Sequence, residues 1–152
     1  MNSEKNFRNR PGFNEIEPWH DDVDKNKISL IINQSDVKTM NEYADYLAKK
    51  YAPHEEKEKK IKLTTSQIRN ILDDVQRMKK EDIESGKHEL LRPKLAYIAG
   101  KSDKNNYSIR GLREILDFAL QNVGKDFNKF ENFRNFFEAI VGYHRFYSKV
   151  KD

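Results

Sequence analysis

Large apolar side chains recur at alternating intervals of three and four residues in the last part of this chain. The repeat comprises Phe130, Phe133, Phe137, Ile140, His144 and Tyr147. An α-helix turns once in about 3.6 residues, so side chains with this spacing share one helical face. That face is widened beyond a single stripe by Phe136, Tyr143 and Phe146. The pattern predicts a helix from about Asp126 to Val150 that is either central in a bundle or shared with a partner.

Weaker stripes of the same period predict four further helical regions. They begin near Ser35, Thr64, Asp82 and Ser108. Ser35 is expected to cap the first, and the sequence from Thr64 to Gln67 has the form of a capping box. Six glycines and four prolines are too few for the turns of a many-stranded sandwich. The fold class predicted is therefore all-α, a single compact bundle of about five helices.

Residues 1–34 have a different composition from the rest of the chain. Asn, Asp, Glu and Lys dominate, and the only apolar run is Ile28 to Ile32. Such a segment buries too little apolar surface to offset the entropy lost on ordering. We therefore predict a flexible N-terminal arm over residues 1–34 and a helical-bundle domain over residues 35–152. Ile28 to Ile32 are expected to dock as a short extended piece, with Trp19 as an anchor.

The sequence offers little that catalysis or metal binding requires. Cysteine is absent, so thiolate nucleophiles, thiolate metal ligands and disulfides are excluded. The four histidines stand alone, and no glycine-rich phosphate loop occurs. Some small helical ribonucleases have an arginine and a histidine separated by four to six residues, but Arg134 and His144, ten positions apart, are too far from each other for this motif. We expect no catalytic residue, no metal and no cofactor, and we interpret His144 as a packed core side chain.

Targeting signals are missing as well. The first residues lack the apolar stretch of a signal peptide, and no run approaches the roughly 18 apolar residues of a membrane helix. We expect a soluble, cytoplasmic protein with no membrane partner.

The net charge of +4 is concentrated in one stretch of the chain. Residues 87–113 carry seven basic and two acidic side chains, a local excess of +5. Tyr97 and Tyr107 lie among these basic groups, and aromatic rings beside Lys and Arg suit RNA. A positive field of this kind favours a polyanion through phosphate contacts, although the same residues would also suit a solvated surface.

Three strings of the sequence resemble one family. They are LTTSQIRNIL (residues 63–72), LLRPKLAYIAGK (residues 90–101) and FFEAIVGYHRFY (residues 136–147). In this order and at these intervals they look like the small helical subunit of the type III-A CRISPR interference complex, the Csm complex. The resemblance covers about residues 60–150.

The resemblance implies a non-catalytic subunit, present in several copies, that touches the guide RNA–target RNA duplex between the backbone subunit and the large subunit. It places the RNA contacts on Gln67, Arg69, Arg92, Lys94, Tyr97, Lys101 and Arg145. Copies of the protein are expected to lie side by side. An alternative function, of a different class, is that of a helical adaptor that presents its aromatic helix to a protein partner and touches no nucleic acid.

Overall fold

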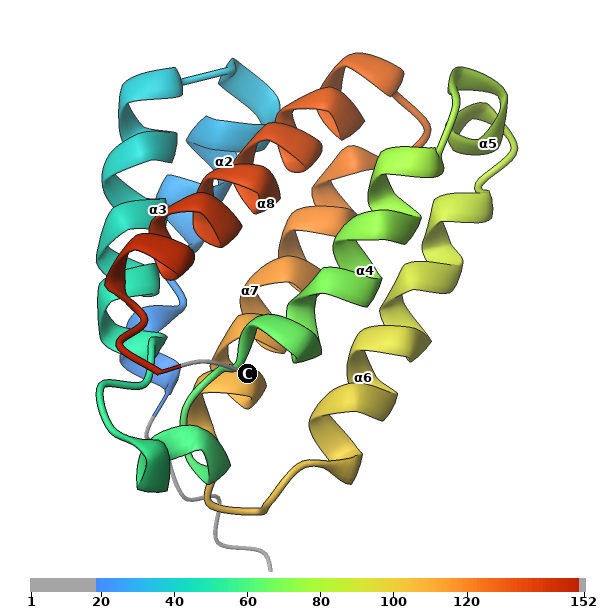
Figure 1. The fold of residues 1–152 in the computed structure, drawn as a ribbon. Helices are drawn as coiled ribbons and strands as arrows, with labels where there is room; N and C mark the ends of the chain where they lie inside the picture. The colour runs from blue at the N-terminus through green and yellow to red at the C-terminus, as the bar shows by residue number, and fades with distance from the viewer. Residues whose placement is uncertain (1–18, 151–152) are drawn as a thin grey trace, which may run out of the picture.

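The computed structural model describes residues 19–150, and this part of the chain is helical without a strand (Figure 1). Its α-helices are α2 (Lys25–Gln34), α3 (Val37–Tyr51), α4 (Thr65–Arg77), α5 (Lys80–Glu84), α6 (Leu91–Lys101), α7 (Tyr107–Val123) and α8 (Phe127–Tyr147). Three short 3-10 helices lie between them, namely η1 (His20–Asp22), η2 (Glu56–Lys60) and η3 (Lys87–Leu90). The all-α prediction is confirmed. The number of helices is seven in the described residues, which is more than the five predicted.

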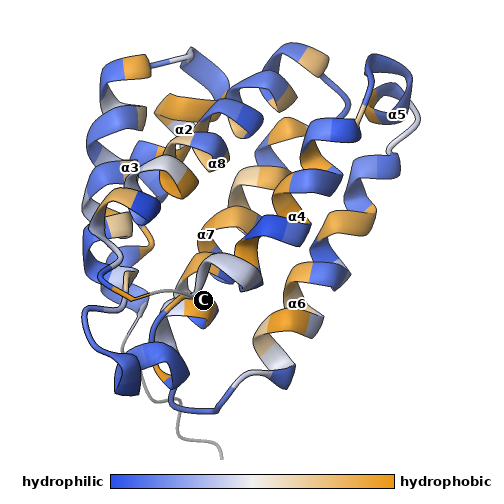
Figure 2. Cartoon of the chain, in the orientation of Figure 1, coloured by the Kyte–Doolittle hydropathy of each residue, from blue (hydrophilic) through white to orange (hydrophobic). Residues whose placement is uncertain are grey.

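Helix α8 is the central element of the bundle. It packs against α2, α3, α4, α5 and α7. Four phenylalanines of α8 are fully buried, and neighbouring rings are in contact, with 5.6 Å between the centroids of Phe130 and Phe133. Figure 2 shows the apolar sides of the helices turned toward one another. Of the two alternatives predicted for this helix, the central position in the bundle is the one observed, except at the last turn, where Phe146 is 78% exposed.

The interpretation of residues 25–34 as part of a flexible arm is wrong. They form α2, whose side chains Ile28, Ile31 and Ile32 are buried against α3, α7 and α8. The Asp24 carboxylate caps the helix by accepting from the backbone N–H of Lys27 at 3.0 Å. Contacts with the other helices therefore stabilise this segment, although its composition alone does not favour an ordered structure. The predicted extended conformation of Ile28 to Ile32 is wrong for the same reason, and residues 1–18 lie outside the described part.

The junction between α2 and α3 also differs from the prediction. Ser35 has a left-handed backbone conformation, with φ of 55°, and it ends α2. The cap of α3 is instead Asp36, whose side chain accepts from the backbone N–H of Thr39 at 3.0 Å. Asp and Ser are both strong N-cap residues, so the sequence alone did not distinguish the two positions.

The remaining boundaries follow known helix signals. Thr64 and Gln67 form the predicted capping box at the start of α4. Gly86, with φ of 83°, makes the turn between α5 and η3, so the helical region predicted to begin near Asp82 is divided into separate helices. The helix predicted to begin near Ser108 is α7, and its cap is Asn106, while Ser108 lies within the helix and is buried.

A short segment before α4 joins three helix ends. The backbone N–H of Leu63 donates to the Tyr51 carbonyl at 2.9 Å, and its own carbonyl accepts from Nε2 of His144 at 2.6 Å. The Lys62 carbonyl accepts from the side-chain amide of Asn106 at 3.1 Å. The interpretation of His144 as a packed, hydrogen-bonded core residue is confirmed.

A pair of substitutions in α2 tests whether this helix belongs to the core. Ile31→Ala should lower the free energy of unfolding by about 2–5 kcal/mol, because it leaves a cavity between helices. Leu30→Ala, on the adjacent half-exposed side chain, should change it by less than about 1 kcal/mol. Urea unfolding followed by circular dichroism measures both. Equal, small effects would show that α2 contributes nothing to the core.

Candidate nucleic-acid interface

Three of the predicted contact residues lie on the outer face of α6. Lys94, Tyr97 and Lys101 follow one another at intervals of three and four residues, so they share one face of this helix. The opposite face is buried through Leu91 and Leu95. Tyr97 is 68% exposed, and the Lys101 ammonium lies 5.3 Å from the centroid of its ring. This face therefore presents a cation beside an aromatic surface that is open to a ligand.

The charge of Lys94 is partly balanced by α4. Its ammonium donates to the Asp74 carboxylate at 2.7 Å, and Arg77 also bonds to Asp74, at 2.5 Å. The hydrogen bond from Lys94 is the main cause that holds the pKa of Asp74 below its ordinary value. Lys94 remains exposed, so it adds positive potential to the surface without being a fully free cation.

Arg92 has a structural role that the sequence did not indicate. Its guanidinium forms a two-pronged interaction with the Asp117 carboxylate of α7, with Nε–Oδ1 and Nη2–Oδ2 distances of 2.7 and 3.2 Å, and also bonds to Glu89 at 3.1 Å. Burial would raise the pKa of Asp117, but hydrogen bonds from Arg92 and Gln121 outweigh it and lower that pKa. Arg92 therefore fastens α6 to α7.

The Gln67 side chain is likewise engaged within the protein. Its amide oxygen accepts from the Thr64 backbone N–H at 2.9 Å, and its amide nitrogen donates to the Ser102 hydroxyl at 3.2 Å. These bonds join the start of α4 to the end of α6. Because Lys94 bonds to Asp74 farther along α4, the two helices run antiparallel.

Arg69 and Arg145 lie along the junction between α4 and α8. The Gln76 amide of α4 donates to the Glu138 carboxylate of α8 at 2.8 Å. Arg69 precedes Gln76 by about two turns, and Arg145 follows Glu138 by about two turns. These two helices are also antiparallel, since the start of α4 lies at the end of α8 where His144 bonds to Leu63. Both arginines therefore lie on this junction toward the same end of the bundle.

Together these residues define the candidate interface, namely Arg69, Lys94, Tyr97, Lys101 and Arg145. Helix α4 packs against both α6 and α8 and lies between them (Figure 1). Arg69, Lys101 and Arg145 are exposed at adjoining ends of the three helices. None of these three forms an ion pair with any residue between 19 and 150. The structure thus groups five of the seven predicted residues on one side and gives Gln67 and Arg92 intramolecular partners.

Other site classes find no support in residues 19–150. No group of three His, Cys, Asp or Glu side chains there could hold a metal ion. No helix of this part is both long and apolar enough to cross a membrane.

The comparison with protein families identifies the chain. A family model described as Csm2 Type III-A matches residues 34–150. The chain belongs to the Csm2 type III-A family. It is thus a small subunit of the type III-A CRISPR complex, Csm, and the family resemblance seen in the three sequence strings is confirmed. Neither a curated protein nor a solved structure matches the chain.

The Csm2 match extends farther than the three strings did. It includes α3, which the resemblance had left mostly outside, and it begins at Gln34, the last residue of α2. The five residues of the candidate interface all lie within the matched range. Trp19 and the rest of α2 lie before it, although they pack against helices of the matched part.

The Arg92–Asp117 pair predicts a pH-dependent contribution to stability. Asp117→Asn should lower the free energy of unfolding at pH 7 by about 1–3 kcal/mol, because Arg92 loses a charged acceptor. Since the folded-state pKa of Asp117 is lowered, this contribution is complete above the unfolded pKa of about 3.9 and is lost as the pH falls through the folded value. Urea unfolding should show a constant difference between wild type and variant above about pH 5 that shrinks below about pH 4. A difference that persists unchanged at pH 2 would contradict this role.

Proposed function

We propose that this Csm2-family subunit is non-catalytic and holds the guide RNA–target RNA duplex in the Csm complex through contacts with the phosphate backbone. In this proposal it works in the cytoplasm and packs against the backbone subunit, the large subunit and further copies of itself. The observation that carries the proposal is the grouping of Arg69, Lys101 and Arg145 at adjoining ends of α4, α6 and α8, where all three are exposed and unpaired within residues 19–150.

The chemistry of these groups suits phosphate better than base edges. Guanidinium and ammonium groups bind phosphate oxygens regardless of sequence. Among the predicted contact residues, the one amide that could read a base edge belongs to Gln67, and both its oxygen and its nitrogen are bonded within the protein. A subunit that must accept any guide sequence needs contacts of this sequence-independent kind.

The position of His144 supports a non-catalytic role. It is completely buried, and its Nε2 is bonded to the Leu63 carbonyl. A general acid or base must come within hydrogen-bonding distance of its substrate, and this side chain is enclosed by the core.

Packing against other subunits is supported by the exposed end of α8. Phe146 projects into solvent beside Arg145, and exposed aromatic side chains are common at the centres of protein interfaces. The adaptor alternative would use this surface alone. In our proposal, Phe146 contacts protein while Arg145 contacts RNA.

Two adjacent substitutions in α8 separate RNA binding from stability. Arg145→Ala should leave the melting temperature unchanged and weaken binding to a fluorescent RNA duplex about fivefold or more, because it removes one phosphate contact. His144→Ala should lower the free energy of unfolding by about 1–3 kcal/mol, because the buried Leu63 carbonyl loses its donor. Fluorescence anisotropy and thermal unfolding measure the two effects.

The matched control is Lys38→Ala, an exposed lysine in α3 that should affect neither measurement. If Arg145→Ala binds RNA as well as wild type does, Arg145 is not part of an RNA interface. If His144→Ala folds normally but loses an RNA-cleaving activity of the wild type, the non-catalytic proposal is wrong.

A further inference from the structure

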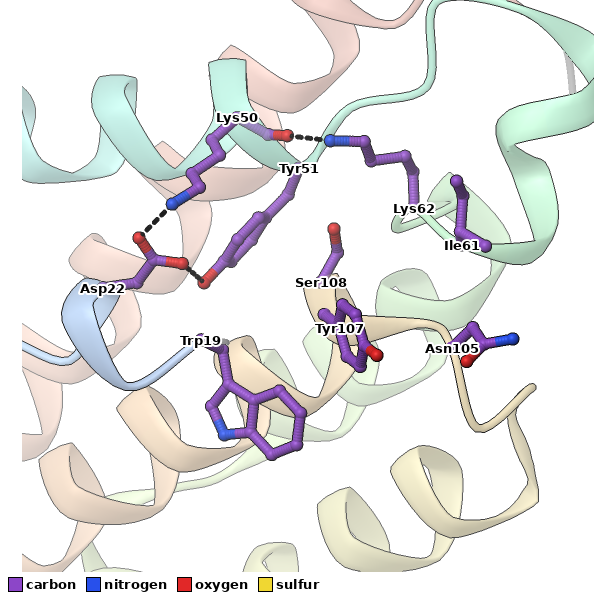
Figure 3. A pocket seen from close by; sticks show the side chains of 9 residues that line it. All are labelled: Trp19, Asp22, Lys50, Tyr51, Ile61, Lys62, Asn105, Tyr107 and Ser108. Carbon is purple, nitrogen blue, oxygen red and sulfur yellow. Dashed lines mark hydrogen bonds and ion pairs between the residues drawn. The ribbon is translucent and has the colours of Figure 1, made fainter. Parts of the chain in front are cut away.

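A cavity of about 400 Å³ lies between the beginning of the described chain, the end of α3 and the beginning of α7 (Figure 3). Trp19, Tyr51 and Tyr107 provide aromatic surface on its walls, while Lys62 and Asn105 lie toward the side opposite Trp19. None of these residues belongs to the candidate interface. The cavity is linked to that interface through the loop that follows Lys101 and leads to Tyr107.

One wall of the cavity is fixed by a buried carboxylate. Asp22 is 3% exposed, and its oxygens accept from the Lys50 ammonium at 2.6 Å and from the Tyr51 hydroxyl at 2.9 Å. Burial raises the pKa of Tyr51, so its hydroxyl stays protonated and can donate to this carboxylate. A side chain at Gly111 would clash here, since an added Cβ would lie 2.4 Å from the Tyr51 hydroxyl oxygen and 2.9 Å from Cβ of Trp19. The close approach of these residues is therefore built into the fold.

The aromatic rings of Trp19 and Tyr107 pack against each other at one side of the cavity. The centroids of Trp19 and Tyr107 are 5.6 Å apart, with their planes inclined by 36°. The indole N–H donates to the Glu114 carboxylate, which fixes the orientation of the Trp19 ring. Tyr107 is partly exposed, and its ring lines the cavity. Rings held in this way provide stacking surface for a nucleobase, whose identity stacking alone does not restrict.

The charge at the cavity favours an anionic ligand. Lys50 is neutralised by Asp22, whereas Lys62 forms no ion pair among residues 19–150. The Lys62 ammonium donates one hydrogen bond to the Lys50 carbonyl at 2.8 Å, which leaves two of its three donors for a ligand. Asn105 adds an amide that can both donate to and accept from a base edge.

We propose that this cavity binds one unpaired nucleotide, with the base against Tyr107 and Trp19 and the phosphate at Lys62. Its volume lies in the range of about 300–1,000 Å³ that is usual for small-molecule sites. The candidate interface is proposed to contact paired RNA only, so a site for an unpaired nucleotide goes beyond the proposed function. The nucleotide could be an unpaired residue of the bound RNA or a free nucleotide.

Trp19 is the single tryptophan of the sequence, so its fluorescence reports directly on this cavity. The full-length protein, excited at a wavelength that nucleotides do not absorb, is titrated with three probes. These are an RNA duplex with one bulged nucleotide, the fully paired duplex, and adenosine monophosphate. The bulged duplex should quench Trp19 more strongly than the paired one. Quenching by the monophosphate at concentrations as low as those of the bulged duplex would assign the site to a free nucleotide.

Two variants link the quenching to the cavity. Lys62→Gln removes the phosphate contact, and Tyr107→Ala removes the stacking surface, so each should raise the Kd from fluorescence about fivefold or more. Lys38→Gln, at the far end of α3, is the control and should not change it. Circular dichroism confirms that each variant is folded.

The proposal is overturned if neither the bulged duplex nor the monophosphate quenches Trp19 more than the paired duplex does. It is also overturned if both cavity variants are folded and keep the wild-type Kd. The anisotropy of the labelled paired duplex independently measures RNA binding at the candidate interface. Normal anisotropy without quenching therefore rejects the cavity site alone, and loss of both signals rejects the RNA-binding function as well.

Discussion

The burial of the aromatic face of α8 is the interaction on which the rest of this structure depends. With only 36% hydrophobic residues, the chain must concentrate its apolar surface, and it does so in the four buried phenylalanines of one helix. Five other helices pack around α8, and two of them, α4 and α7, support α6 in turn. The cations of α4, α6 and α8 lie on one side of the molecule because these helices are held in this arrangement. The candidate interface is thus a consequence of the core.

The sequence predicted those helices whose apolar spacing is long and regular, such as α7 and α8. It failed at α2. Ile28, Ile31 and Ile32 have helical spacing, but they belong to a short apolar run that is flanked on both sides by polar residues. Periodicity cannot separate a short buried helix from a short buried strand. The helix is stabilised by its contacts with α3, α7 and α8, and such contacts cannot be read from local composition.

The candidate site was predictable to the same limited degree. Spacing along α6 correctly places Lys94, Tyr97 and Lys101 on one face, because that face depends on helical geometry alone. The carboxylate partners of the basic residues could not be foreseen, since Asp117 and Asp74 lie on other helices, 25 and 20 residues away in sequence from Arg92 and Lys94 respectively. Counting charges along the chain therefore overestimated how many cations in residues 87–113 are free to meet RNA.

The salt dependence of RNA binding tests the central claim most directly. Binding of the full-length protein to two duplexes of unrelated sequence is measured over a range of salt concentrations. Three free cations that contact phosphates predict a slope of log K against log salt of about −3, equal for both duplexes. In the double variant Arg69→Glu/Lys101→Glu the slope should fall to about −1 with no change in helical content. A slope near zero, or a wild-type slope that the double variant retains, would contradict the assignment of this surface to RNA.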